Sequence, residues 1–293
     1  MYIKPNPPKF LELLEEVYHD EGVEKEKQKT NIVRYYPSSA SFKKPDGTVV
    51  GACLRQLFYR ASNEPETDAK ELTTKLQGDF GNGIHDILLK KLSKSKRIKI
   101  TPEASGRIKL DGLDNEISFR LDGLVNYQAE RGGLEIKTVQ SFAVQKMVKE
   151  SGPRDSYLLQ ILSYFLTDDT LKWFSLILFG RDTAYRAEYL IYKDEQGRYL
   201  LEGVFPRKAP KVIEFNEEGI VARWKELEQH LKNKTVPQRD YKAVLSKEGN
   251  FVEKRVKNYV DYKSDVACRY CEYRTKCWSL PDAKDHAYKV PGD

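Results

Sequence analysis

Apolar residues recur at helical spacing in six stretches of the chain, and each stretch predicts a helix. After Cys53, for example, Leu54, Leu57, Phe58 and Ala61 follow one another at intervals that place them on one side of a helix. In the stretch at residues 72–92, Gly78, Gly81 and Gly83 weaken the first half of the predicted helix, because glycine is a poor helix former. The predicted helices are residues 8–19, the segment after Cys53, and residues 72–92, 141–149, 157–166 and 217–232.

The middle of the chain has the shorter, alternating apolar pattern of strands. Strands are predicted at residues 107–110, 116–125, 133–139, 171–179 and 186–192, and Asp-Gly, Gly-Gly and Asp-Asn pairs between some of them read as turns. The sequence shows neither a repeat nor a clean linker. We therefore expect one α/β domain over residues 1–293, with a helical N-terminal part (1–70), a core (71–235) and a basic tail (236–293).

Composition limits the class of protein. The chain has 293 residues, of which 40% are hydrophobic and 32% charged, and its mean hydropathy is −0.65. The apolar runs are too short to span a bilayer, and the first thirty residues lack the apolar core of a signal peptide. We expect a cytoplasmic protein with no membrane partner, so its four cysteines need an explanation other than disulfides.

Charge is compatible with nucleic-acid binding without demonstrating it. The net charge is +6 and the pI about 8.8. Residues 90–99 contain six basic and no acidic residues, and residues 239–277 contain ten basic and six acidic ones. Such clusters can follow a phosphate backbone, although a solvated helix end and a polar loop have the same composition. The candidate contacts are Lys90, Lys91, Lys94, Arg97, Arg269 and Tyr270.

Two carboxylates and a lysine form the first candidate site. Asp122 lies at the end or bend of a predicted strand, and Glu135 and Lys137 share one face of the next strand while Ile136 points into the core. Hairpin pairing of these strands would bring Asp122 beside Glu135. Paired carboxylates suit Mg²⁺ or Mn²⁺, and a neighbouring lysine can orient water for phosphodiester hydrolysis. An exposed ion pair and an Asp-Gly turn would give the same pattern.

Three further polar residues extend this candidate site. His85 follows Gly81 and Gly83, which would allow a backbone or a phosphate to approach, and its imidazole can bind a metal. Gln160 and Tyr164 share one face of the 157–166 helix because they are four residues apart. A structural histidine and a polar helix edge are the alternative interpretations.

In this order, the G-x-x-x-H segment, the strand Asp, E-x-K and Q-x-x-x-Y resemble the RecB-like branch of the PD-(D/E)XK nuclease superfamily. The matching segment extends from Gly81 to Tyr164. The resemblance implies a restriction-endonuclease-like core, a mixed sheet flanked by helices. It also implies that His85, Asp122, Glu135 and the Ile136 carbonyl bind the metal, that Lys137 acts on the attacking water, and that Gln160 and Tyr164 support the site and contact DNA.

The four cysteines form a second candidate site. Cys268, Cys271 and Cys277 have the spacing C-x2-C-x5-C, and Cys53 lies more than two hundred residues upstream. Soft thiolates at short spacing select zinc or an iron–sulfur cluster. A four-cysteine zinc site usually pairs two C-x2-C segments, whereas this chain has one, so the spacing favours a cluster and leaves zinc open.

The arrangement of one cysteine before and three after the core is similar to that of iron–sulfur nucleases of the RecB-like group, which include CRISPR-associated exonucleases and the nuclease domain of AddB. The resemblance implies a 4Fe-4S cluster that joins the N- and C-terminal elements. We therefore expect a metal-dependent DNA exonuclease, with endonuclease or flap activity also open, that acts on single-stranded DNA or DNA ends in recombination, repair, replication or spacer acquisition.

Other classes of function stay open at this point. A DNA-end-binding subunit with little or no cleavage, or an RNA-directed or transposon-associated nuclease, would share these motifs. A homo-oligomer and protein partners of recombination or CRISPR type are compatible with the sequence. The chain lacks the G-x-x-x-x-G-K-[ST] motif of a helicase motor.

Overall fold

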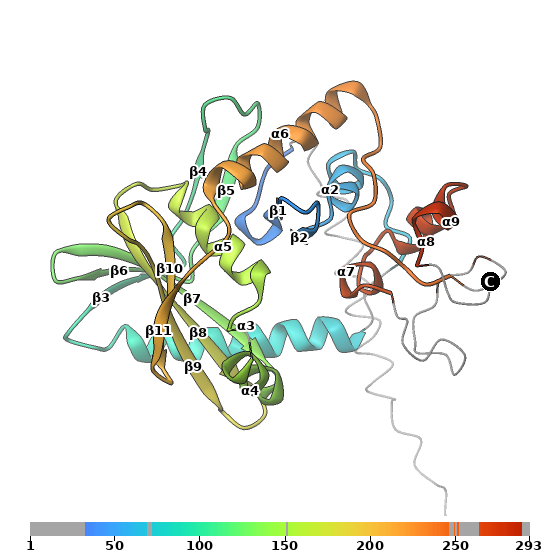
Figure 1. Ribbon diagram of the computed structural model, residues 1–293. Helices are drawn as coiled ribbons and strands as arrows, with labels where there is room; N and C mark the ends of the chain where they lie inside the picture. Colours follow the sequence, from blue (N-terminus) through green and yellow to red (C-terminus); the bar gives the residue numbers. More distant parts are fainter. Residues whose placement is uncertain are drawn as a thin grey trace, which may run out of the picture.

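A mixed sheet of seven strands forms the centre of the fold in the computed structural model (Figure 1). The structure describes residues 33–68, 72–150, 152–245, 249, 251 and 264–288, so the predicted helix at 8–19 lies outside the described residues. In spatial order the strands are β11 (Lys208–Val212), β10 (Tyr199–Phe205), β9 (Arg186–Lys193), β8 (Leu171–Gly180), β7 (Glu130–Val139), β6 (Gly123–Tyr127) and β3 (Lys99–Pro102).

The parallel pair lies in the middle of this sheet. Strands β7 and β8 are parallel, whereas the other neighbouring pairs are antiparallel. A parallel pair needs a crossover connection, which α4 (Ser141–Lys149) and α5 (Asp155–Phe165) supply. Two small sheets accompany the large one, namely β1 (Ser41–Lys43) with β2 (Val49–Gly51) and β4 (Ser105–Ile108) with β5 (Ile117–Arg120).

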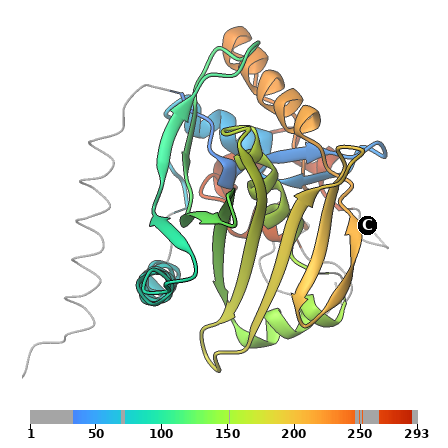
Figure 2. The same ribbon diagram turned by 90° about the vertical axis from the view of Figure 1, so that its left-hand side faces the viewer.

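Helices lie on both faces of the large sheet (Figure 2). On one face, α3 (Leu72–Leu92) inserts Leu89 into a cluster that includes Leu134 and Ile136 of β7. On the other face, α4 and α5 cover the main core, in which Leu159 and Phe174 are fully buried. Helix α6 (Glu217–Asn233) joins this core through Trp224, whose ring stacks on that of Tyr35 at a centroid distance of 5.3 Å.

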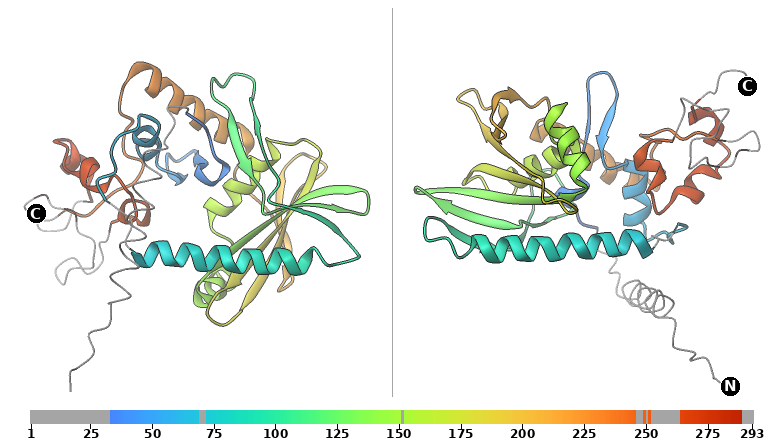
Figure 3. Two further views of the ribbon diagram at one scale, coloured as in Figure 1. Left: turned by 180° about the vertical axis from the view of Figure 1, so that it is seen from behind. Right: turned by 90° about the horizontal axis from the view of Figure 1, so that it is seen from below.

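Segments from the two ends of the described chain lie side by side (Figures 1 and 3). Helix α2 (Leu54–Ala61) packs near α7 (Val266–Arg269), α8 (Arg274–Trp278) and α9 (Ala283–His286). The C-terminal segment also has a small core of its own, which includes Leu245, Trp278 and Ala283. The fold therefore brings the first cysteine to the same region as the last three.

The strand predicted at 116–125 is interrupted at Leu121 and Asp122. Its first part is β5, which pairs with β4, and its second part is β6, which belongs to the large sheet. Asp122 therefore lies at the bend between two strands of different sheets, one of the two positions that the sequence predicted for it. The pairing of β6 with β7 ends at Gly123, which lies opposite Leu134. Because of the bend, the residues of β7 after Leu134 have no β6 residue beside them.

The Gly-Gly pair is not a turn, contrary to the prediction, because Gly132 and Gly133 lie inside β7. A β-carbon on Gly132 would come within 2.3 Å of the Trp173 ring, and one on Gly133 within 2.0 Å of the Phe174 ring. Both glycines are therefore required by the aromatic rings that lie over the strand. The turn of this hairpin is instead formed by Gln128 and Ala129, which both have positive φ.

Most of the predicted elements are confirmed. Helices α3 and α4 have the predicted bounds, and α2, α5, α6, β8 and β9 differ from prediction by a few residues at most. The sequence analysis missed β1, β2, β3, β10 and β11. Across the part of the chain that the structure describes, no helix combines the length and the apolar character needed to cross a membrane.

Candidate functional site

The carboxylate of Asp122 lies at the edge of β7 that the bend leaves open. Its Oδ2 accepts a hydrogen bond of 2.6 Å from the Ile136 amide. Because the N–H and C=O of one residue leave an extended strand at the same edge, the Ile136 carbonyl faces this side too. The Nδ1 of His85 lies 3.7 Å from the same Asp122 oxygen. Three of the four predicted metal ligands therefore meet at this edge.

Glu135 and Lys137 point to the opposite face from Ile136, toward α5, where they join a hydrogen-bond network. Lys137 Nζ lies 2.6 Å from Glu135 Oε1 and donates to Gln160 Oε1 at 2.7 Å. Gln160 Nε2 lies 2.9 Å from Glu135 Oε1 and 2.7 Å from the Tyr164 hydroxyl. Tyr164 in turn donates to the Arg120 carbonyl at 2.9 Å. The predicted E-x-K and Q-x-x-x-Y groups therefore form one connected unit.

Glu135 is a deeply buried acid with an unused oxygen. Its side chain is about 3% exposed, and its Oε2 has no hydrogen-bond partner among the described residues. Burial raises the pKa of Glu135 to about 7, even though Lys137 acts in the opposite direction. A buried carboxylate oxygen without a partner is costly, and a bound cation would remove that cost.

Gly81 allows α3 to approach β7 at this site. A β-carbon at Gly81 would lie 2.8 Å from Thr138 Oγ1. One helical turn later, His85 is thereby held near Asp122. At Gly83, by contrast, a β-carbon would meet no other atom within 4 Å, so packing does not require a glycine at this position.

The predicted nucleic-acid contacts are not brought together. Lys90 and Lys91 are exposed at the end of α3, and Lys94 and Arg97 follow in the turn before β3. Arg269 and Tyr270 lie at the end of α7, near the opposite end of α3 (Figures 1 and 3). A helix of 21 residues is about 30 Å long, so these two groups are far apart.

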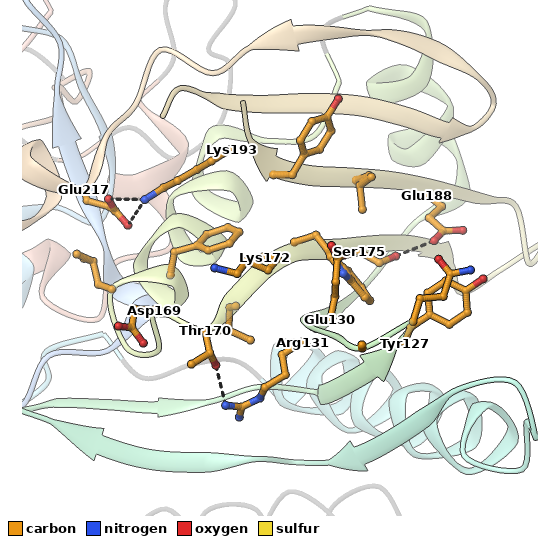
Figure 4. Close-up of a pocket in the computed structure, with 18 residues that line it drawn as sticks. Tyr127, Glu130, Arg131, Asp169, Thr170, Lys172, Ser175, Glu188, Lys193 and Glu217 are labelled. Atoms are coloured by element: carbon orange, nitrogen blue, oxygen red, sulfur yellow. Dashed lines mark hydrogen bonds and ion pairs between the residues drawn. The ribbon is translucent and has the colours of Figure 1, made fainter. Parts of the chain in front are cut away.

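A groove of about 1160 Å³ lies at the end of β7 and β8 remote from Lys137. Two of its basic side chains have polar partners within the groove (Figure 4): Lys193 forms an ion pair of 3.1 Å with Glu217, and Arg131 donates a hydrogen bond of 2.7 Å to Thr170. Glu188 likewise accepts a hydrogen bond of 2.7 Å from Ser175. Its mixture of acidic and basic groups is a poor match for a polyanion, so we place the candidate site at the carboxylates.

All four cysteines line one small cavity between α2 and the C-terminal helices. Cys53 precedes α2, Cys268 lies in α7 and Cys277 in α8, with Cys271 between the two helices. None of the four forms a disulfide. The aromatic residues Tyr59, Tyr241, Tyr273 and Trp278 contribute to the lining, together with Arg55 and Arg239.

Polar contacts hold the two chain ends together around this cavity. Arg239 forms a bidentate pair with Asp282, with distances of 2.7 and 3.0 Å, and donates to the Cys277 carbonyl. The buried Glu272 accepts from Gln56 at 2.7 Å and from Arg60 at 2.5 Å. The Glu272 contacts join α2 directly to the C-terminal segment, and together with the Arg239 contacts they would keep the thiols close without any metal.

Burial affects the protonation of three of the thiols. It raises the pKa of Cys53, of Cys268 and of Cys271, the last to about 12. For Cys268 and Cys271, the neighbouring cysteines add to the effect, because thiolates so close together repel one another. These three thiols are therefore protonated near neutral pH, and a metal would have to displace their protons.

Side chains of neither site converge on a single point. Among the described residues, no three His, Cys, Asp or Glu side chains are arranged so that they could share one metal ion. At the carboxylate site, Lys137 and the Ile136 amide occupy oxygens of Glu135 and Asp122. The donors fit a hard cation at the carboxylates and a soft metal centre at the thiols by chemical type.

Sequence reasoning missed two residues beside the catalytic candidates. Lys137 Nζ lies 5.5 Å from the centroid of the Tyr157 ring, and the Arg154 guanidinium lies 5.7 Å from the same centroid. Tyr157 is three residues before Gln160, and Arg154 is three residues before Tyr157. This helical spacing was a signal available in the sequence.

Comparison with known proteins assigns no family. No family model and no curated protein matches the chain. One matching solved structure, described as "Crystal structure of SSO0001", is 16% identical, with coverage of 92% of this chain and 96% of that chain and a TM-score of 0.46. So distant a similarity identifies neither a family nor an activity.

Proposed function

We propose that this protein is a metal-dependent DNA nuclease of the RecB-like PD-(D/E)XK type, acting mainly as an exonuclease. The observation that supports this proposal most strongly is the unit formed around β7: Glu135, Lys137 and Gln160 are hydrogen-bonded to one another, and Asp122 bonds the amide of the intervening Ile136. The mixed sheet flanked by helices agrees with the core that this resemblance implies.

His85, Asp122, Glu135 and the Ile136 carbonyl would hold Mg²⁺ or Mn²⁺. The bound ion would supply an activated water and neutralise charge that develops on the phosphate. Lys137 would orient the attacking water. Gln160 contacts both Glu135 and Lys137, and Tyr164 is hydrogen-bonded to Gln160. Gln160 and Tyr164 would therefore fix the position of the Glu135 carboxylate relative to the Lys137 ammonium.

We further propose a structural 4Fe-4S cluster at the four cysteines. The cavity that they line and the docking of α2 against α7 and α8 support this assignment. A cluster distributes its thiolates over several irons, whereas zinc needs four thiolates converging at about 2.3 Å from one ion. Closing so long a loop would stabilise the native state by restricting the unfolded chain.

The substrate would be single-stranded DNA or a duplex with single-stranded ends. A binding subunit without cleavage is the competing function, and the complete network around Lys137 favours the enzyme. The test is incubation of anaerobically purified protein with end-labelled single- and double-stranded DNA, with and without Mn²⁺. We expect Mn²⁺-dependent loss of the labelled strand. A folded, iron-loaded protein that degrades neither substrate would contradict the proposal.

A further inference from the structure

A stripe of side chains on α5 continues from the buried network to the surface. Tyr157, Gln160 and Tyr164 follow one another at intervals of three or four residues and therefore lie on one side of the helix, and Arg154, the residue just before the first turn, continues the stripe with its guanidinium over the Tyr157 ring. Tyr164 and Gln160 are buried, Tyr157 is half-buried and Arg154 is exposed. The inner half of this stripe belongs to the network described above, so the outer half lies where a substrate would enter.

Tyr157 restrains the ammonium of Lys137 from a third direction. Lys137 Nζ is already bonded to Glu135 and Gln160 through oxygen atoms, and the Tyr157 ring lies over it at 5.5 Å. The face of an aromatic ring attracts a cation, and the interaction is stronger where water is excluded. In the half-buried position of Lys137, with 22% of its side chain exposed, this attraction limits the directions that the ammonium can take.

Arg154 is a cation at the outer end of the stripe, and the N–H donors of its guanidinium are unused within the described residues. Its guanidinium also lies over the Tyr157 ring, at 5.7 Å, and within the described part of the chain it forms no hydrogen bond or ion pair. Two cations that share one ring repel each other, and an anion between or beside them removes the repulsion. A planar guanidinium with unused donors matches a phosphate in particular.

From this geometry we propose that the active site extends outward by two residues, and the proposal rests on the nuclease function proposed above. Tyr157 is a positioning residue that holds Lys137 toward the reacting phosphate. Arg154 binds a neighbouring phosphate of the same strand, so the site engages at least two consecutive phosphates of a DNA backbone. The proposal predicts different consequences for the two residues, because one acts on Lys137 and the other on the substrate.

Nuclear magnetic resonance of the free protein, labelled with ¹³C at lysine Cε, tests the role of Tyr157 without any substrate. Assignment uses Lys137→Arg, which removes one signal. The ring current of Tyr157 should shift the Lys137 Cε–H signal upfield in the wild type and in Tyr157→Phe, whereas Tyr157→Leu should return it to the range of exposed lysines. A shift that survives Tyr157→Leu overturns the positioning role, whether or not the protein cleaves DNA.

Cleavage kinetics then separate the two residues. Tyr157→Leu should lower kcat by about 2- to 30-fold, the range expected for one cation–π contact, with KM little changed and with Tyr157→Phe close to wild type. Arg154→Ala should raise KM and leave kcat nearly unchanged. Equal losses in Tyr157→Phe and Tyr157→Leu would contradict the role of the ring.

The salt dependence of DNA binding tests the Arg154 contact directly. Loss of one phosphate contact should reduce the slope of log K against log salt by about 0.7 for single-stranded DNA in Arg154→Ala. The matched control is Arg207→Ala, since Arg207 is exposed beyond β10, and its slope should equal that of the wild type. An unchanged slope in Arg154→Ala overturns its role. Absence of DNA binding by the wild type overturns both this role and the proposed function, while the resonance of Lys137 still decides the role of Tyr157.

Discussion

The carboxylate site and the cysteine site are assembled in different ways. The carboxylate site uses residues 85–164, which belong to neighbouring strands and to the helices packed on them. The cysteine site unites positions from the two ends of the described chain, with contacts such as Gln56 to Glu272 that span 216 positions. The first site is therefore part of the core sheet, whereas the second depends on docking of two peripheral segments.

The two sites also differ in the state of their donors. The carboxylate site is a charged, hydrogen-bonded network in which Glu135 retains one unused oxygen. The thiols of the cysteine site are buried (Cys268) or half-buried beside aromatic rings, with raised pKa values for Cys53, Cys268 and Cys271. Hard cations suit the first set and soft metals the second. Losing the first metal should thus affect catalysis, and losing the second should affect stability.

The largest expected effect is on catalysis, in Lys137→Ala. Removal of the ammonium should lower the cleavage rate by about 10²–10⁴-fold, the usual contribution of one positioned proton-transfer group, while DNA binding and iron content stay unchanged. Lys149→Ala is the matched control, since Lys149 is exposed on α4. Full activity in Lys137→Ala would separate the network from the chemistry and refute the site assignment.

Cys271→Ala should have the largest effect on stability. Loss of one thiolate should release the cluster and lower the free energy of unfolding by roughly 3 kcal/mol or more, because metal binding is coupled to folding. Iron analysis and thermal unfolding of anaerobically purified protein measure both effects. Tyr270→Ala is the control, since the neighbouring Tyr270 is 72% exposed. Equal iron content in Cys271→Ala and the wild type would rule out the cluster at this position.

A smaller effect, dependent on pH, is expected in Glu135→Gln without divalent metal. Burial raises the pKa of Glu135 to about 7 from 4.5, so the folded protein holds this proton more strongly than the unfolded chain. Stability from this group is present below pH ~4.5 and is lost as the pH rises through ~7. The variant lacks this loss, so its melting temperature relative to wild type should rise by roughly 5 °C between pH 4.5 and 8.

Divalent metal should make the wild type, rather than Glu135→Gln, the protein with the higher melting temperature at pH 8. Saturating Mn²⁺ binds the native carboxylates and should stabilise the wild type at pH 8, with little effect on Glu135→Gln. Thermal unfolding with and without Mn²⁺ measures this reversal. A melting temperature difference that does not vary with pH would show that Glu135 is ionised throughout and that its burial is overcome by Lys137.

The smallest effect is expected in Glu272→Gln, which weakens the docking of the chain ends. Burial disfavours the Glu272 charge, but Arg60 more than compensates, and the pKa of Glu272 is lowered. The pair therefore stabilises the fold above the unfolded pKa of Glu272, and this contribution disappears as the pH falls below it. We expect a loss of about 1 kcal/mol at pH 7 and a smaller loss at pH 4. The control is the exposed Glu195→Gln, and equal values at both pH values would contradict the ion pair.

Sequence periodicity predicted α2 to α6 well, because each of these helices buries an apolar face in a hydrophobic core. The bounds of α3 follow from its apolar face, even though it contains Gly78, Gly81 and Gly83. The same method failed at Gly132 and Gly133, because the rings that need these glycines come from β8, which is distant in sequence. It also missed β10 and β11; β11 is an exposed edge strand that lacks the alternating pattern of a half-buried strand.

The motifs of the candidate site were visible in the sequence, but their distances were not. The alternation of β7 places Glu135 and Lys137 on one face, as predicted, and the bend at Asp122 brings that carboxylate to the Ile136 amide. Packing decides that Glu135 and Lys137 face α5 and that Ile136 faces α3. The roles of Tyr157 and Arg154 depend on the same packing, which spacing alone does not specify.

Direct binding of Mn²⁺, followed by the electron paramagnetic resonance of the free ion, tests the central claim that the carboxylates form a hard-cation site. The wild type should bind about one ion per chain near the carboxylates, and Asp122→Asn should abolish this binding. Asp86→Asn removes the same charge one residue after His85, on an exposed part of α3, and should bind like the wild type. Equal binding by Asp122→Asn and the wild type, or no binding by either, would contradict the account.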